Sequence, residues 1–166
     1  QKKGAGAIDF SNDKKLIYHD YDARGNPLQV SKADGTHISY IWGYQQQHPI
    51  AKIENATLEQ VGSALASLDS NDAQTVEELQ LLSDKDDTTC ISECNEETLR
   101  EALNTLRAAL PFAQVTTYTY DPLVGVTSIT DPRGETIYYQ YDAFQRLEFV
   151  KDSEGNVLRK NEYNYK

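Results

Sequence analysis

The chain has 166 residues and a formal net charge of −10, and it contains no methionine. This length is enough for one domain with a hydrophobic core. No apolar run approaches the roughly 20 residues that a membrane-spanning helix needs. The acidic balance leaves no basic stripe, which disfavours binding to nucleic acid or to an anionic membrane. The missing methionine leads us to expect a fragment of a longer chain, in which the lack of a signal peptide is uninformative.

Charge and aromatic residues divide the chain into two kinds of segment. Between Glu54 and Glu101 there are thirteen acidic residues against only Lys85 and Arg100. All eleven tyrosines and the single tryptophan lie outside residues 45–111. We therefore expect an acidic middle segment that is joined at both ends to a nearly neutral, tyrosine-rich one.

The first tyrosine-rich segment has the pattern of strands. Residues 1–7 offer nothing to bury, and residues 8–18 predict a hairpin. In the next hairpin, the return strand alternates between an aromatic and aliphatic face and a mostly polar face. The first face carries Ile38, Tyr40 and Trp42, so we expect His37 on the exposed face of a half-buried strand.

The acidic middle segment changes to the period of a helix. Its apolar residues recur every three or four positions, which predicts helices over residues 57–68, 72–83 and 95–110. The stretch from Asp69 to Asp72 is expected to stop the first helix and to supply a cap for the second, and Asn95 is expected to cap the third. The polar run over residues 83–94 is expected to be the least structured part.

From Val115 the strand pattern resumes as an internal repeat. Tyr118-x-Tyr120-Asp121 returns 21 residues later as Tyr139-x-Tyr141-Asp142. A glycine follows the aspartate by thirteen residues in three units, at Gly35 after Asp22, at Gly134 after Asp121 and at Gly155 after Asp142. A fixed period of this size is typical of stacked supersecondary units.

The spacing also predicts three-residue hairpin loops. The residues from Asp131 to Gly134 suit a type I turn that is followed by a glycine at positive φ. Loops of this length oppose apolar residues across each hairpin, whereas two-residue loops would set apolar against polar faces. The expected pairs are Val30 with Ile38, Ile129 with Ile137, and Val150 with Leu158.

These units resemble the Rhs/YD-repeat family of large bacterial secreted or surface proteins, which contain long strings of β-hairpins. The resemblance covers residues 18–54 and 113–166, and residues 49–56 and 115–126 further resemble the C-terminal end of such chains. It implies a secreted or cell-surface location, with neighbouring repeats of the parent chain, surface glycans or proteins as partners. The structural residues that carry it are Tyr21, Asp22, Gly35, Tyr118, Tyr120, Asp121, Asp131, Gly134, Tyr139, Tyr141, Asp142 and Gly155. Three departures, His19, Gly125 and Gln145, lead us to expect turns that differ from unit to unit.

The predicted fold is α+β, an antiparallel sheet of repeated hairpins with a three-helix insertion. Residues 8–54 and 113–166 would form the sheet as one domain, and residues 55–112 the insertion. We interpret the insertion as a cap, because open sheet edges and the ends of repeat arrays need covering. The alternative is a freely projecting arm, and burial of Leu99, Leu103 and Leu106 against strands would distinguish the two.

The sequence contains no recognised catalytic or cofactor motif. The three histidines, His19, His37 and His48, are scattered, and the acidic run from Asp84 to Glu93 lacks the glycine and glutamate of a helix-loop-helix calcium site. If the chain is secreted, as the resemblance implies, a disulfide between Cys90 and Cys94 is plausible in a loop. We therefore expect a non-enzymatic structural or interaction segment that uses no cofactor.

Two alternatives stay open. Asp131 begins a sequence that resembles the Asp-Pro-x-Gly motif at which the repeat shell of some Rhs toxins cleaves itself, although Glu135 stands where a leucine follows in that motif. A carbohydrate-binding module is the other alternative, because aromatic rings stack on sugars. Its candidate contacts are Tyr44 and Tyr138, which fall outside the signature, together with Trp42.

Overall fold

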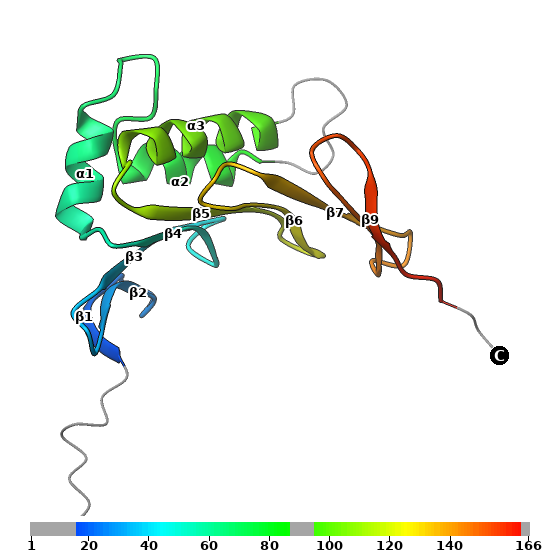
Figure 1. Ribbon diagram of the computed structural model, residues 1–166, viewed down its shortest axis with the longest axis horizontal. Coiled ribbons are helices and arrows are strands. Elements are labelled where there is room, and N and C mark those ends of the chain that lie inside the picture. The colour runs from blue at the N-terminus through cyan, green and yellow to red at the C-terminus, as the bar shows by residue number, and fades with distance from the viewer. Residues whose placement is uncertain (1–15, 87–94, 164–166) are drawn as a thin grey trace, which may run out of the picture.

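The computed structural model describes residues 16–86 and 95–163, in which nine strands form one antiparallel sheet (Figure 1). Each strand pairs with its neighbours in the chain, which confirms an α+β fold with an antiparallel sheet. The hairpin expected to begin at Ile8 and the pair Cys90 and Cys94 lie outside the described residues. The strands are β1 (Leu16–Tyr21), β2 (Pro27–Lys32), β3 (His37–Gly43), β4 (His48–Glu54), β5 (Gln114–Asp121), β6 (Gly125–Thr130), β7 (Thr136–Tyr141), β8 (Leu147–Lys151) and β9 (Val157–Lys160).

Three helices follow β4 and precede β5: α1 (Leu58–Ala66), α2 (Val76–Asp84) and α3 (Asn95–Ala109). The first two begin with capping boxes at Thr57 and Thr75, in which the threonine and the residue three positions on accept each other's backbone N–H. The expectation that the stretch from Asp69 to Asp72 caps the second helix is wrong, because Thr75 and Glu78 form the capping box of α2. Within the described residues, no helix is long and apolar enough to cross a membrane.

The helices pack on one face of the central strands. The side chains of Leu99, Leu103 and Leu106 are fully buried, in one core with Ile41 and Ile53 from the sheet. A freely projecting arm would leave these leucines exposed. The helices lie over the face of β3 to β6 and leave the edge strands β1 and β9 outside their cover (Figure 1).

The covered face is the one that carries small hydroxyl side chains. The register places Ser39 opposite Ile53, on the helix side, whereas Ile38, Tyr40 and Trp42 point to the other side. His37 is therefore half-buried on the helix side, and its expected place on an exposed face is wrong. Small side chains let the helices approach the strands closely, which alternation alone does not reveal. The buried hydroxyl residues of this face include Ser39, Thr117, Thr119, Ser128 and Thr130.

Most of the predicted hairpin register is confirmed. Val30 opposes Ile38 and Ile129 opposes Ile137, and the loop glycines Gly35, Gly134 and Gly155 have φ values of 86°, 88° and 84°. The pairing of Val150 with Leu158 is wrong, because Val150 opposes Arg159 across a bulge. Leu158 lies on an edge strand and is 57% exposed, so no core selects its register.

Candidate functional site

One aspartate organises each of four hairpin turns in the same way. Its Oδ1 atom accepts the backbone N–H groups of the residues two and four positions on, at 2.8–3.0 Å, in the turns that begin at Asp22, Asp131, Asp142 and Asp152. In three of these turns the residue four positions after the aspartate also donates a side-chain hydrogen bond to Oδ2. These residues are Asn26, Arg146 and Asn156. The hydrogen bonds from Arg146 and Asn156 lower the pKa of Asp142 and Asp152.

The turns differ where the sequence departs from the signature. Gln145 occupies the place of a turn glycine and adopts a φ of 60°, in the region that glycine prefers. Gly125 has a φ of 154°, and Asp121 accepts only the N–H group of Leu123 through Oδ1 among the bonds described for its turn. The expectation that individual turns differ is confirmed.

The second aromatic residue of each signature binds the preceding strand. The hydroxyl of Tyr141 donates to the carbonyl of Val126 at 2.9 Å, and the hydroxyl of Tyr120 donates to that of Pro49 at 2.9 Å. Two further contacts have the same form, from Trp42 Nε1 to the Pro27 carbonyl at 2.9 Å and from the Tyr163 hydroxyl to the Leu147 carbonyl at 3.0 Å. We call these four contacts the aromatic ladder.

The aromatic ladder is continuous across the sheet. In the backbone register Trp42 lies opposite Pro49, Tyr120 opposite Val126, and Tyr141 opposite Leu147. In each pair, the first residue donates its side-chain hydrogen bond to the preceding strand. The residue opposite it provides the backbone carbonyl that accepts the next hydrogen bond of the ladder. The second aromatic position of the signature, Trp42 included, is therefore used in joining the strands.

A strained turn between β3 and β4 is held by α2. Tyr44, Gln45 and Gln46 have φ values of 50°, 57° and 60°, a conformation that costs about 1–2 kcal/mol for each residue with a side chain. The N–H of Tyr44 donates to Ser83 Oγ at 2.9 Å, and the N–H of Gln45 donates to Asp84 Oδ1 at 2.5 Å. These bonds from the end of α2 stabilise the turn and join the helix to the sheet.

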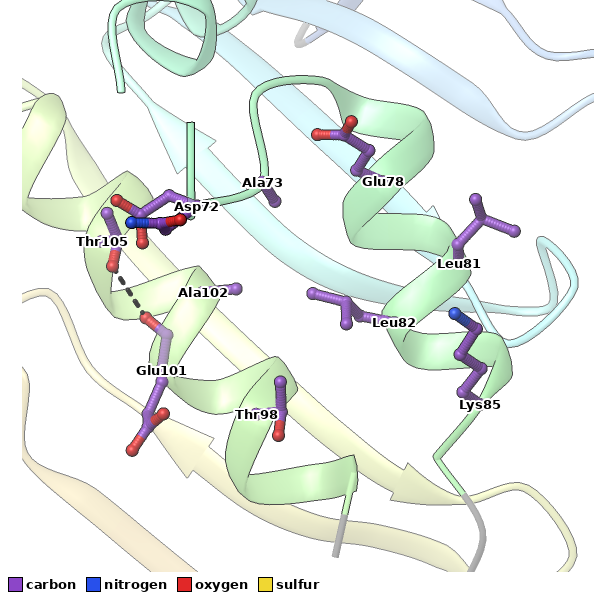
Figure 2. A pocket seen from close by; sticks show the side chains of 11 residues that line it. Asp72, Ala73, Glu78, Leu81, Leu82, Lys85, Thr98, Glu101, Ala102 and Thr105 are labelled. Carbon is purple, nitrogen blue, oxygen red and sulfur yellow. Dashed lines mark hydrogen bonds between the residues drawn. The ribbon is translucent and has the colours of Figure 1, made fainter. Parts of the chain in front are cut away.

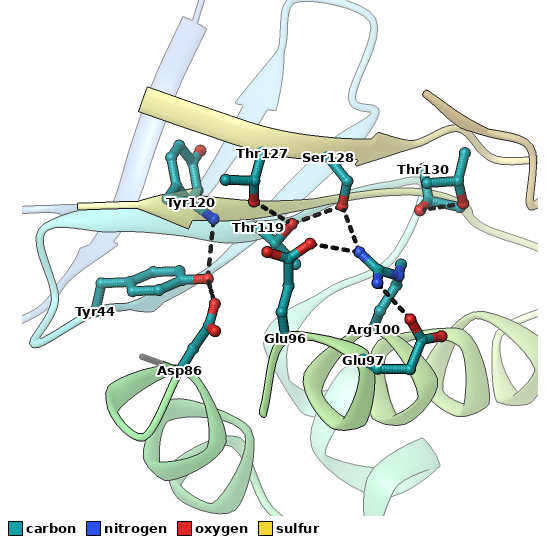
Figure 3. Close-up of polar contacts among 11 residues, drawn as sticks. Tyr44, Asp86, Glu96, Glu97, Arg100, Thr119, Tyr120, Thr127, Ser128 and Thr130 are labelled. Atoms are coloured by element: carbon teal, nitrogen blue, oxygen red, sulfur yellow. Dashed lines mark hydrogen bonds and ion pairs between the residues drawn. The ribbon is translucent and has the colours of Figure 1, made fainter. Parts of the chain in front are cut away.

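The Tyr44 side chain continues this junction into the core (Figure 3). Its hydroxyl donates to Asp86 Oδ2 at 2.6 Å and accepts the N–H of Tyr120 at 2.9 Å. Burial and the neighbouring Asp86 carboxylate raise the pKa of the Tyr44 phenol, which stays protonated at neutral pH. The expectation that Tyr44 is an exposed contact is wrong: the residue is 4% exposed because both of its ends are bound within the fold.

Arg100 joins the start of α3 to the hydroxyl-bearing face (Figure 3). Its guanidinium donates to Ser128 Oγ at 3.1 Å and pairs with Glu96 and Glu97 at 2.6 and 2.5 Å. Burial alone would lower the pKa of Arg100, but its hydrogen bonds to Glu97 and Glu96 outweigh burial and raise that pKa. The guanidinium also lies 5.1 Å from the centre of the Tyr138 ring, which is half-buried beneath it.

Arg107 makes the same kind of connection about two helical turns further along α3. Its Nη2 donates to Thr117 Oγ1 at 2.8 Å, and its Nε donates to the carbonyl of Val115 at 3.1 Å. Burial lowers the pKa of Arg107. Sequence reasoning missed both arginines as structural residues; the available signals were the spacing of Glu96 and Glu97 to Arg100 and the run of threonines in β5.

The three candidate ligand contacts do not form one surface. Tyr44 is buried, Tyr138 lies beneath Arg100, and Trp42 points to the opposite face of the sheet. Asp131 uses Oδ1 in the same turn contacts as three other aspartates. In the part of the chain that the structure describes, no group of three or more His, Cys, Asp or Glu residues is arranged to hold a metal ion.

Comparisons with known proteins find no match to this chain, either among protein-family models or among curated proteins. The function is therefore inferred from the polar contacts of the sheet, the turns and the helices. These polar groups connect helices, turns and strands to one another. The hydroxyl groups of Thr119 and Ser128 bind each other, and that of Ser128 also accepts a hydrogen bond from Arg100.

Proposed function

We propose that this chain is a non-enzymatic structural or interaction segment of a bacterial secreted or cell-surface YD-repeat protein. One observation carries the proposal, which is the exposure of apolar side chains on both edge strands. Stacked repeat units bury such side chains against the next unit. Neighbouring repeats of the parent chain would pair with β1 and β9 and cover these residues: Leu16, Ile17, Tyr18 and Tyr21 on β1, and Val157 and Leu158 on β9.

The aromatic ladder and the turn aspartates support the same conclusion. The recurring residues Tyr141 and Asp142 have partners that hold neighbouring strands and turns in place. Tyr120 and Asp22 have equivalent partners in their own units. Among the described residues, the construction of the sheet thus accounts for the signature.

The helices fit this proposal as an insertion into one repeat unit. In the aromatic ladder, Trp42 and Tyr141 each bind a carbonyl 15 residues earlier in the chain. Tyr120 binds a carbonyl 71 residues earlier, so its contact spans 56 additional residues. The contact keeps its form although the helices lie between its two residues. We infer that the helices cap the hydroxyl-bearing face of the central strands, and that further repeats extend the sheet at its edges.

Adding one repeat unit tests the proposal. A second copy of residues 142–163, placed directly after Tyr163, recreates a Tyr-Asp junction and should pair with β9. We expect the backbone amides of β9 to exchange with solvent more slowly than in the original chain, and a shuffled unit of the same composition to have no such effect. Unchanged amide exchange at β9 would overturn the interpretation that further repeats pair with the edge strands. Cleavage next to Asp131 on a denaturing gel, abolished by Asp131→Asn, would overturn the non-enzymatic interpretation.

Glycan binding is a second candidate, supported by a different set of rings from the one expected. Tyr40, Trp42 and Tyr118 are partly exposed and share the face of the sheet opposite to the helices. The ring centres of Tyr40 and Trp42 are 6.5 Å apart. Because Trp42 is the only tryptophan, quenching of its fluorescence by members of a glycan panel would report binding directly. Tyr40→Ala should abolish that signal, and binding that survives this change would exclude this face.

A further inference from the structure

A groove with a volume of about 490 Å³ lies between α2 and α3 (Figure 2). Its floor is apolar and half-buried, formed by Ala73, Leu82 and Ala102, which pack against the core. Leu81 stands at the rim and is 55% exposed. The alanines leave room for an incoming backbone, and the exposed leucine offers further apolar surface.

The rim of the groove is acidic. Among the described residues that line it, Asp72, Glu78 and Glu101 are acidic and Lys85 is the one cation. Both arginines of α3 are bound towards the sheet, at Ser128 and Thr117, so they do not neutralise this side of the helices. The groove thus combines an apolar floor with an excess of carboxylates on different helices.

We propose that this groove binds a basic amphipathic segment of a partner protein. An apolar side chain of the partner packs over Ala73, Leu82 and Ala102, while its lysines or arginines face the carboxylates of the rim. Grooves between two helices commonly accept the apolar face of a third. The charge of the rim selects a cationic partner and repels acidic ones. The proposal rests on the helices alone and does not depend on the repeat identity of the sheet.

A labelled synthetic peptide with leucines at helical spacing and lysines elsewhere is the probe for this groove. Fluorescence anisotropy should show that it binds the whole chain, more weakly as the salt concentration rises. Glu101→Lys should weaken binding by about tenfold, which is about 1.4 kcal/mol. The matched control is Glu77→Lys, the same charge change at an exposed position of α2 outside the groove, which should have little effect. Ala102→Phe, which fills the floor, should abolish binding while the circular dichroism spectrum stays unchanged.

Three outcomes would overturn the proposal. Equal weakening by Glu77→Lys and Glu101→Lys would mean that the peptide is attracted to acidic surface in general. Equal binding by a peptide with serine in place of leucine would mean that the apolar floor is not used. Equal binding by a peptide with glutamate in place of lysine would remove the role of the carboxylates.

Discussion

The Tyr44 hydroxyl donates a 2.6 Å hydrogen bond to the Asp86 carboxylate, 42 residues further along the chain. The same hydroxyl accepts the N–H of Tyr120 from the middle of the sheet. One phenol therefore joins the β3–β4 turn, the segment after α2, and β5. Its neighbours Ser83 and Asp84 bind the backbone of the same turn, so the end of α2 and the sheet are held at several points.

Tyr44→Phe should destabilise the protein by about 1–3 kcal/mol, because the N–H of Tyr120 loses its acceptor in a buried place. Urea unfolding followed by circular dichroism measures the change. Tyr18→Phe is the matched control, since Tyr18 is about half exposed on an edge strand and should tolerate loss of its hydroxyl. Equal stability of the Tyr44 variant and the original chain would show that the junction contributes nothing.

Gln145→Gly should stabilise the protein by about 0.5–1 kcal/mol, because Gln145 holds a φ of 60° that glycine adopts without strain. Gly134→Ala is the reciprocal change in an equivalent turn. It should destabilise by about 1 kcal/mol through the backbone alone, because an added Cβ would meet no atom within 4 Å. Chemical denaturation measures both changes. Shifts of the same sign would contradict the account of these turns.

Asp142→Asn should cost stability at neutral pH and cost less in acid. The pKa of Asp142 is lowered by Arg146, so its contribution is fully present above the unfolded pKa and is lost as the pH falls through the folded pKa. The stability difference between the original chain and the variant should therefore shrink from about pH 6 to about pH 3. Effects of the overall negative charge are nearly common to both proteins and cancel in this difference. A difference that stays constant with pH would contradict the role given to the carboxylate.

Replacing residues 57–110 with a short turn should make the remaining sheet self-associate. The replacement exposes the helix-side face, including Ile41, Ile53 and Val115, which are buried in the intact protein. Light scattering after size-exclusion chromatography would detect the change of mass. A truncated sheet that stayed monomeric and equally stable would show that the helices do not cap it.

Elements whose signals are local could be predicted from the sequence. The three helices were indicated by their leucine periodicity, and the loop conformations at Gly35, Gly134 and Gly155 by their turn residues. The aromatic ladder was also accessible, because Pro27 and Trp42 repeat the spacing of Val126 and Tyr141.

Features that depend on distant segments could not be predicted in this way. The face bearing Ile38, Tyr40 and Trp42 has the more apolar pattern, yet the helices cover the hydroxyl-bearing face, where two arginines of α3 find acceptors. The burial of Tyr44 depends on Ser83 of α2 and on Asp86 just after it, about 40 positions away in the chain. At Leu158 the edge strand has no core to fix its register. A bulge therefore occurs there, and Val150 opposes Arg159 instead of Leu158.

The place of the helices in the chain also sets the order in which the sheet can form. Within β1 to β4 and within β5 to β9, each strand pairs with the next one across a short loop, which closes quickly. The pairing of β4 with β5 instead joins Glu54 to Gln114 across the whole helical segment, and a longer loop has a larger entropic cost of closure. We expect the two sets of hairpins to form early and to meet late, with the slow folding step at the junction between β4 and β5.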